Sequence, residues 1–339
     1  MNHKYYSLQI IRGLAAWLIV FYHYMQFFHN YNYTSFVGAF FSLYGRYGVD
    51  IFFVLSGVVM GITITRNKNI TPSNFICKRV IRVVPTYWFY TILMCGIIFL
   101  TKNDTISGYN IVSLIKSLLF IPNENVAGIG VFPILPVGWT LNLEIFFYFI
   151  LFIMLFFFKE KALFYTMLFL IVLPFIWNKT FPFYEVVGSK LLVEFSLGIY
   201  IFIYALKYNI NTRVYYYIIF VGMLMMFLSM GYNRYIGIFV SGFIIFGFMG
   251  VEKNNKSISC HGFLYKLGEI SYSTYLCHIP IYLIAINYIE RKNTILDNDF
   301  IFITFLSVII YIVSCLSFKF IEKPFSNLEM KKYNAKSVK

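Results

Sequence analysis

Arg12 and His23 lie inside the first hydrophobic run of this chain, at 7–28. An Arg or a protonatable His near the centre of a bilayer costs about 2.5 kcal/mol or more, so such residues usually face a bundle interior, a water-filled cavity or a ligand. Eleven residues separate them, which on a helix is about three turns and roughly 16 Å along one face. A single groove could contact both. Buried residues of these types mark ligand pathways and proton relays, so the pair is a functional candidate.

Three of the carboxyl groups in later hydrophobic runs are functional candidates. Asp50 is near the start of the second run, where an acidic side chain either caps a helix start or pairs with a base on a neighbouring helix. Glu144 lies a turn or more inside an otherwise apolar run, with Asn142 and Tyr148 near it. It is a structural hydrogen-bond partner or a proton-transfer group, and for an intramembrane carboxylate the functional interpretation is the default. Glu194 is a further buried acid, for which the sequence offers no companion.

Arg79 and Arg82 come between the second and third hydrophobic runs. Their spacing of three residues places both on one face of a helix at the cytoplasmic interface. Paired guanidinium groups bind phosphate through parallel hydrogen bonds. Basic residues at a membrane edge also anchor the helix and contact anionic lipid headgroups, which is the usual explanation. Both interpretations stay open for this pair.

A polar cluster opens the ninth hydrophobic run. Ser271, Tyr272, Ser273 and Tyr275 precede His278, and Pro280 follows two residues later. A proline inside a helix kinks it and frees a backbone carbonyl. His278 could therefore merely satisfy that distortion.

The composition requires a membrane bundle to position these residues. Hydrophobic residues make up 60% of the chain, charged residues only 12%, and the mean hydropathy is +0.72, whereas an ordinary soluble domain has roughly 25% charged residues. Runs long enough to cross a bilayer predict an all-α polytopic protein with ten transmembrane helices, and the sequence Glu322-Lys-Pro324 predicts the end of the last one. The ten predicted spans are 8–28, 46–64, 82–100, 140–158, 162–178, 188–206, 214–231, 235–250, 267–288 and 300–320.

The distribution of the basic residues sets the topology. The formal net charge is +14, but most Lys and Arg fall in segments that are cytoplasmic if the N-terminus is, as the positive-inside rule requires. Both termini are then cytoplasmic, and nucleic acid is not needed to explain the charge. We expect one transmembrane domain at 1–330 and a short basic tail at 331–339. The basic residues predicted to lie outside are Arg46, Lys102, Lys116, Lys179, Lys190, Arg234, Arg291 and Lys292.

The cysteines and the longest connection between predicted helices give weaker evidence about function. Five cysteines are scattered without a CxxC pair or a His at zinc-like spacing, so we predict reduced packing residues and no metal site. The longest connection, 101–138, contains an amphipathic stretch at 111–120 and then a segment rich in Gly and Pro. A loop of this length is either a lid or a plain surface excursion.

Taken together, the motifs resemble the acyltransferase 3 family, in the expected order over nearly the whole chain. The resemblance implies a ten-helix enzyme of the bacterial cytoplasmic (inner) membrane. It would transfer an acyl group, commonly acetyl from cytoplasmic acetyl-CoA, to a hydroxyl of a surface carbohydrate such as O-antigen, capsule or exopolysaccharide, or of its lipid-linked precursor. The motifs are Arg12 with His23 eleven residues later, YGVDIFFVLSG at 47–57, KRVIRVVPTYW at 78–88, WTLNLE at 139–144, LGEISYSTYLCHIP at 267–280 and EKP at 322–324.

The resemblance also implies roles for individual residues. Arg79 and Arg82 would hold the phosphates of CoA, and Arg12 would steady the pantetheine or a phosphate. His23 would be the general base, with Glu144 or Asp50 orienting it; a covalent acyl-enzyme is the alternative. The remaining expected contacts are Tyr87 and Trp88 to the donor, and Trp139, Asn142, Tyr272 and His278 to the acceptor.

The rival interpretation is a secondary transporter or polysaccharide exporter, because intramembrane Arg, His, Asp and Glu also build proton relays. The sequence has no detectable internal repeat of the kind that builds many transporters. A purely structural or sensory membrane protein would leave the buried charges unexplained.

Overall fold

The computed structural model describes residues 5–33, 35–67, 70–101, 110–125, 128–181, 183–255, 262–292 and 299–327. Within these ranges the chain is helical throughout, apart from turns and one isolated antiparallel bridge between Glu124 and Val131. The prediction of an all-α protein is confirmed. The described chain divides into two compact units, one from 1–72 and 146–271 and the other from 73–145 and 272–339. The prediction of one domain at 1–330 stays a prediction, and the tail at 331–339 lies outside the described residues.

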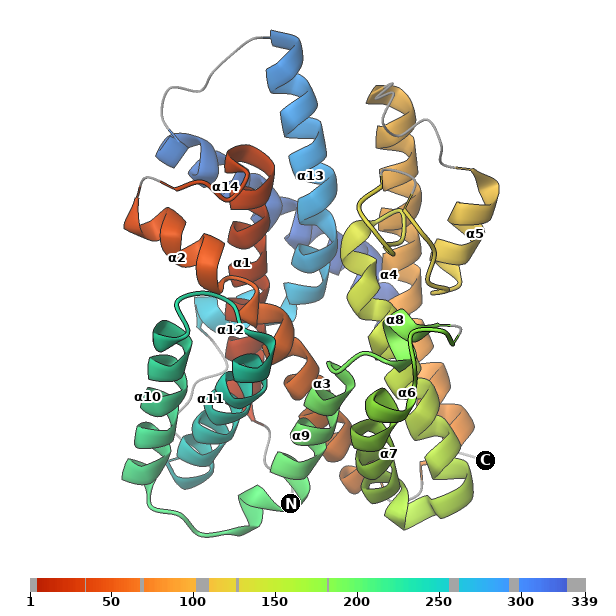
Figure 1. The fold of residues 1–339 in the computed structure, drawn as a ribbon, viewed down its shortest axis with the longest axis vertical. Helices are drawn as coiled ribbons and strands as arrows, with labels where there is room; N and C mark the ends of the chain where they lie inside the picture. Colours follow the sequence, from red (N-terminus) through yellow and green to blue (C-terminus); the bar gives the residue numbers. More distant parts are fainter. Residues whose placement is uncertain are drawn as a thin grey trace. The chain divides into compact units, whose positions relative to one another are not determined.

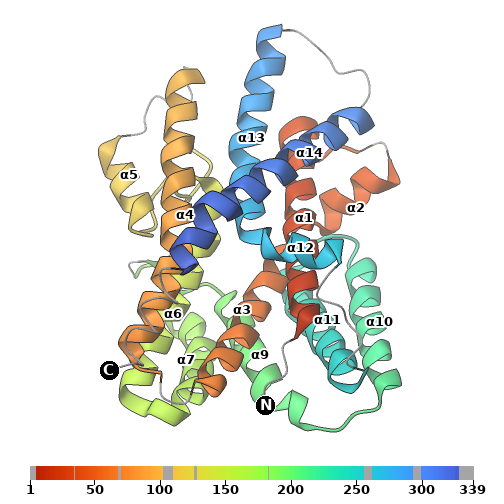
Figure 2. The same cartoon turned by 180° about the vertical axis from the view of Figure 1, so that it is seen from behind.

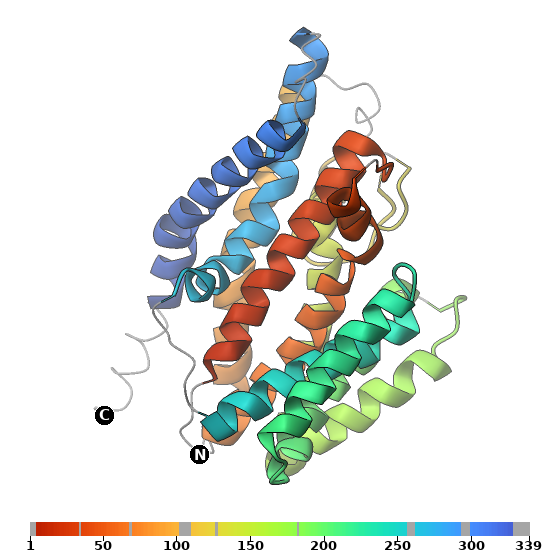
Figure 3. The ribbon, with the colours of Figure 1, turned by 90° about the vertical axis from the view of Figure 1, so that its left-hand side faces the viewer.

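The first unit holds the N-terminal helices and the middle of the chain (Figure 1). In it α3 packs on α9, α10 on α11 and α1 on α12, and the side view shows α10 and α11 running alongside each other (Figure 3). Its apolar core includes Leu8, Ala15, Val54, Ile201 and Ile245. The helices are α1 (Tyr6–His29), α2 (Phe36–Tyr44), α3 (Tyr47–Arg66), the end of α6 (Trp139–Phe158), α7 (Ala162–Ile176), α8 (Tyr184–Val187), α9 (Leu192–Ile203), α10 (Thr212–Leu228), α11 (Arg234–Asn255) and α12 (Phe263–Glu269).

Glycines let the helices of this unit approach closely. A side-chain carbon added to Gly57 of α3 would overlap the carbonyl oxygen of Phe195, and one added to Gly198 of α9 would overlap that of Val54. Small residues at such crossings bring backbones into contact, which is how helices pack inside membranes. The contact fixes α3 against α9, and with it the position of Asp50 relative to Glu194.

The second unit is built on α4 (Pro72–Thr101), seen from behind in Figure 2. Beside it are α5 (Ile111–Leu118), the 3₁₀ turn η2 (Pro136–Gly138) and the start of α6, then α13 (Ser271–Lys292), α14 (Asp299–Ser317) and the π-helical turn η5 (Phe318–Glu322). A capping box closes the N-terminus of α5, because Asn110 and Ser113 each accept the other's backbone N–H. The amphipathic stretch predicted at 111–120 is therefore a short helix.

Each of the ten predicted runs contains a helix, but fewer meet the length and hydropathy of a membrane span. Seven segments of the described chain do so, which makes the protein multi-pass. Ten spans and cytoplasmic termini stay predictions. The seven segments are Tyr6–His29, Tyr47–Arg66, Pro72–Thr101, Pro136–Ile176, Tyr184–Ile203, Arg234–Asn255 and Asp299–Asn327, and Thr212–Leu228 is a shorter apolar helix.

Several element boundaries differ from the sequence predictions. Helix α4 begins at Pro72, ten residues before the predicted span, because Lys and Arg lower hydropathy without lowering helix propensity. The run at 267–288 breaks at Ile270 into α12 and α13, and α2 forms in a segment taken as a connection. The helix stop predicted at Glu322-Lys-Pro324 is wrong: helical structure continues to Asn327. The π-helical turn before Pro324 is the local rearrangement through which a proline is accommodated.

Candidate active site

Arg12 and His23 lie on one uninterrupted helix, α1, and both side chains are half-buried. The start of α3 packs closely on the stretch between them. A side-chain carbon at Gly45 would lie 2.6 Å from Cβ of Tyr22, and one at Gly48 would lie 2.6 Å from the carbonyl oxygen of Ala15. The shared helix that the spacing predicted is confirmed, and Gly45 and the start of α3 pack against its middle.

The N-terminus of α1 is closed by a residue from a distant part of the chain. Tyr5, at the N-cap position, gives no side-chain cap. Instead the buried carboxylate of Glu252 in α11 accepts hydrogen bonds from the backbone N–H groups of Tyr6 at 2.7 Å and Ser7 at 2.8 Å. A negative charge at this end of a helix also suits the helix dipole. Glu252 therefore positions the helix that carries Arg12 and His23.

Asp50 and Glu194 form a fully buried carboxyl pair between α3 and α9. Both residues are 0% exposed, and their side chains are in hydrogen-bonding contact. The hydroxyl of Tyr232 donates to Oδ1 of Asp50 at 3.1 Å. Among the described residues, no N–H or O–H group donates to the other oxygen of Asp50 or to either oxygen of Glu194. With Tyr232 as the donor to one of their four oxygens, two touching carboxyl groups avoid mutual repulsion by sharing one proton.

Space for this pair comes from a glycine. A side-chain carbon at Gly237 of α11 would lie 2.9 Å from the carboxyl carbon of Asp50. The interpretation of Glu194 as an acid without a companion is wrong, because Asp50 is its partner. The groups that act on Asp50 are Glu194, Tyr232, Arg46 and Arg234. The expectation that Asp50 orients His23 gains no support from these contacts.

Arg79 and Arg82 share α4 as predicted, but they differ in exposure. The side chain of Arg79 is 9% exposed, with its guanidinium 5.9 Å from the centre of the Phe75 ring, whereas Arg82 is exposed. Arginine stacks on aromatic rings and still donates hydrogen bonds at its edge. The pair thus combines a held guanidinium with an accessible one, three residues apart on the same helix.

Tyr87 and Trp88 tie α4 to α5. The buried hydroxyl of Tyr87 donates to the carbonyl of Ser117 at 3.0 Å, and its ring stacks on Phe120. The indole N–H of Trp88 donates to the carbonyl of Leu118 at 2.9 Å. Both predicted donor contacts have a positioning role in the structure; a role in binding the donor stays a prediction.

The start of α6 is fastened to α13 through Tyr275. The hydroxyl of Tyr275 donates to the carbonyl of Val137 at 3.0 Å and lies 2.8 Å from the hydroxyl of Thr140. Glu144, half-buried one turn further on, is within electrostatic reach of this tyrosine. Asn142 is buried, and no described residue donates to its side-chain oxygen. Polar groups therefore gather where α6 begins.

Tyr272 and His278 lie on α13. The hydroxyl of Tyr272 donates to the carbonyl of Val83 at 2.8 Å, which fixes α13 to α4 one residue beyond Arg82. His278 is 0% exposed, and its Nδ1 lies 3.2 Å from the carbonyl of Thr274, which can only accept, so Nδ1 carries the hydrogen. His278 is a buried residue of the α13 core, and its predicted contact with the acceptor stays a prediction.

The two units divide the predicted site residues. Arg12, His23 and Asp50 belong to the first unit. The predicted pairing of His23 with Glu144 joins residues of different units and stays a prediction. Sequence reasoning missed Glu252 and Tyr232, whose signal was a polar type at the edge of an apolar run, and it placed Tyr275 in a polar cluster without a role of its own. The second unit holds Arg79, Arg82, Tyr87, Trp88, Trp139, Asn142, Glu144, Tyr272 and His278.

Apolar helices of membrane-spanning length define a multi-pass membrane protein, and each of its two units buries polar or charged side chains. Residues 5–320 match the family model of the acyltransferase 3 family, described as an acyltransferase domain. The chain belongs to this family.

One curated relative shares part of the chain. It is the exopolysaccharide production protein ExoZ of Rhizobium meliloti, 37% identical over 106 residues. The alignment covers 31% of this chain and 32% of the relative, so the match spans about a third of that protein's length. No solved structure matches this chain.

Proposed function

We propose that this protein transfers an acetyl group from cytoplasmic acetyl-CoA to a hydroxyl of an exopolysaccharide-type glycan or its lipid-linked precursor, at the bacterial cytoplasmic membrane. Membership of the acyltransferase family over 5–320 is the observation that carries the proposal. The partial likeness to an exopolysaccharide production protein favours a polysaccharide acceptor. O-antigen and capsule are acceptors of the same chemistry.

The residues of α4 fit a CoA phosphate site. Arg79 is buried with its guanidinium near the Phe75 ring, while Arg82 is exposed on the same helix. A diphosphate carries several oxygens, and two guanidinium groups three residues apart offer parallel hydrogen bonds to them. Arg12 supplies a further cation for the pantetheine or a phosphate. Lys78, next to Arg79, adds charge that attracts an anionic donor.

The proposed chemistry is direct transfer with His23 as the base. A neutral imidazole takes the proton of the glycan hydroxyl as its oxygen attacks the thioester carbonyl. The carbon–sulfur bond then breaks, CoA leaves as a thiolate, and the imidazolium returns the proton to sulfur. The products are the acetyl ester and CoA, with no net proton released. Glu144 would stabilise the imidazolium. An acyl-enzyme on His23 or a hydroxyl is the alternative path to the same products.

Acceptor-dependent thioester consumption tests the proposal. Purified full-length protein in lipid nanodiscs receives acetyl-CoA with and without glycan, and free CoA is measured together with acetyl ester on the glycan. We expect CoA release that requires the glycan and equals the ester formed. In a parallel experiment the protein is reconstituted into liposomes. Glycan uptake without thioester consumption would replace the acyltransfer proposal with transport.

A further inference from the structure

A cluster of cations and tyrosines covers the buried carboxyl pair at one end of the first unit. Its members come from the start of α3, the segment before α9 and the start of α11, and the close packing of α3 on α9 brings those starts together. All three of its cations are among the basic residues predicted to lie outside the membrane. We call this cluster the rim; it consists of Arg46, Lys190, Tyr232, Arg234 and Tyr235.

Two cation–tyrosine contacts hold the rim. The guanidinium of Arg46 lies 4.6 Å from the centre of the Tyr232 ring, and Nζ of Lys190 lies 2.9 Å from the Tyr235 hydroxyl. Arg234 is exposed and acts electrostatically on both tyrosines. The rim therefore combines two cation–tyrosine pairs with an accessible guanidinium that acts on both tyrosines.

The buried Asp50–Glu194 pair holds Tyr232 of the rim in place, and its negative charge is smaller than the positive charge of the rim. Because Asp50 and Glu194 share one proton, they carry one negative charge against three cations. Burial, and next the two carboxyl groups, raise the pKa of Tyr232 well above its ordinary value, so its hydroxyl stays a donor to Asp50. This hydroxyl points inward to a carboxylate. In an interfacial anchor, by contrast, the polar end of the tyrosine faces headgroups and water.

We propose that the rim binds the carboxylate-bearing sugars of an acidic polysaccharide. Guanidinium forks match carboxylates, and tyrosine faces and edges suit the flat apolar faces of sugar rings. The positive-inside rule disfavours cations on the outer side, so three of them gathered at the meeting of three packed helices call for a ligand. This proposal names the substrate class and rests on the proposed function.

Binding without acyl donor tests the rim directly. The full-length protein in zwitterionic nanodiscs is titrated with an oligouronate and with the same oligosaccharide after its carboxyl groups are reduced to alcohols. We expect the oligouronate to bind about tenfold or more tightly, and salt to weaken that binding. Arg46→Gln and Arg234→Gln should each reduce its affinity about tenfold. Equal affinity for the two sugars would overturn the proposal.

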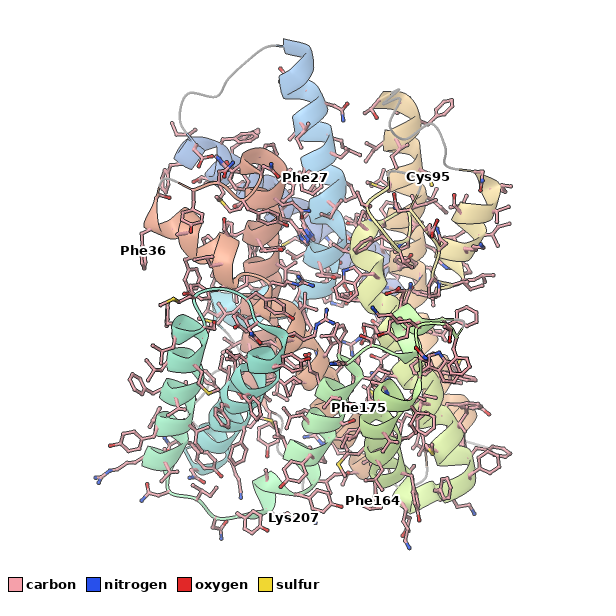
Figure 4. All side chains as sticks on the ribbon, in the orientation of Figure 1. Phe27, Phe36, Cys95, Phe164, Phe175 and Lys207 are labelled. Atoms are coloured by element: carbon pink, nitrogen blue, oxygen red, sulfur yellow. The ribbon has the colours of Figure 1, made fainter. Side chains whose placement is uncertain are left out.

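Lys207 provides a matched control. It lies after the other end of α9, exposed, with its Nζ 5.5 Å from the ring centre of Tyr204, and it is labelled in Figure 4. Lys207→Gln removes a cation–tyrosine pair outside the rim and should leave oligouronate affinity unchanged, whereas Lys190→Gln should lower it. Equal losses in both variants would show non-specific attraction and count against the rim. Thermal unfolding of each variant identifies a misfolded one, and Arg234→Lys, which keeps the charge, should restore part of the affinity.

Two further readouts separate the alternatives. Mass spectrometry of co-purified lipid detects headgroup binding. If the Arg46→Gln and Arg234→Gln proteins lose anionic lipid but bind the oligouronate as tightly as the wild type, the rim is a lipid anchor and the proposal is overturned. Acetyl transfer is measured in parallel. Transfer to a neutral glycan without oligouronate binding defeats only the rim. Oligouronate binding without any thioester consumption supports the rim and defeats the acyltransfer proposal.

Discussion

The carboxylate of Glu252, near the end of α11, accepts the backbone N–H of Ser7, in the first turn of α1, at 2.8 Å. A second bond to the N–H of Tyr6 makes the contact bidentate. Helix α1 carries the proposed base and has no N-terminal side-chain cap of its own. This buried acid therefore fixes the N-terminal end of the helix that carries Arg12 and His23.

Replacing Glu252 should loosen α1. Glu252→Ala removes the acceptor from the buried N–H of Ser7 and the partly buried N–H of Tyr6, which lowers the free energy of unfolding by about 1–3 kcal/mol. Glu252→Gln keeps one acceptor oxygen and should lose less. Thermal or denaturant unfolding in detergent measures both, with exposed Glu160→Ala as the control. A Glu252→Ala protein as stable as the Glu160→Ala protein would contradict the capping role.

Replacing His23 should abolish transfer and spare the donor site. General-base catalysis contributes about 10²–10⁴-fold, so His23→Ala should lose at least that much in acetyl-transfer rate while acetyl-CoA binding stays measurable. His29, in the last turn of the same helix, provides the matched control. His29→Ala should retain turnover. Full turnover in the His23 variant would remove it from the mechanism.

Replacing Arg79 or Arg82 should weaken donor binding before it affects chemistry. A hydrogen bond between charged groups contributes about 1.5–3 kcal/mol, so each alanine variant should bind CoA roughly 10–100-fold less tightly. Calorimetry with CoA measures the loss, and raised salt should narrow the difference between wild type and variant. Arg213→Ala, at an exposed helix start, serves as control. Unchanged CoA affinity in both α4 variants would leave these arginines as lipid anchors.

Asp50 and Glu194 should behave as one unit. Either alanine substitution leaves the other carboxyl group without its partner. The loss of unfolding free energy in the double variant Asp50→Ala/Glu194→Ala should therefore differ from the sum of the two single losses by about 0.5–3 kcal/mol. The control is the same double-mutant comparison made with Asp50 and Glu252. Glu252 is 15 residues beyond Gly237 on α11, about 22 Å along the helix. That cycle should be additive, and equal coupling in both would argue against a specific pair.

The glycine crossing of α3 and α9 predicts opposite effects of the same substitution. Gly57→Ala places a methyl group on the carbonyl of Phe195, which should cost about 1–3 kcal/mol as overpacking. Gly96 lies in α4 with nothing within 4 Å of the added carbon. Gly96→Ala should therefore be neutral or stabilise by about 0.5–1 kcal/mol, since alanine favours helix. Comparing the two melting temperatures checks the crossing.

The sequence by itself determined where the helices lie and which residues could do chemistry. Hydrophobic runs are local signals, and each of the ten predicted runs contains a helix. Motif order led to the acyltransferase family, whose match over 5–320 confirms it. Exact helix ends were harder to predict from the sequence, because hydropathy falls at Arg79 and Arg82 although the helix continues through them.

Only the tertiary structure decided which polar residues meet. Asp50 and Glu194 lie on different helices, and their contact depends on the glycine crossing at Gly57 and Gly198. Glu252 reaches α1 because α11 packs beside it. Periodicity assigns a residue to a face of its own helix, but the crossing angle and rotation of a neighbouring helix arise from packing over the whole interface. That is why an acid without a companion in the sequence has one in the fold.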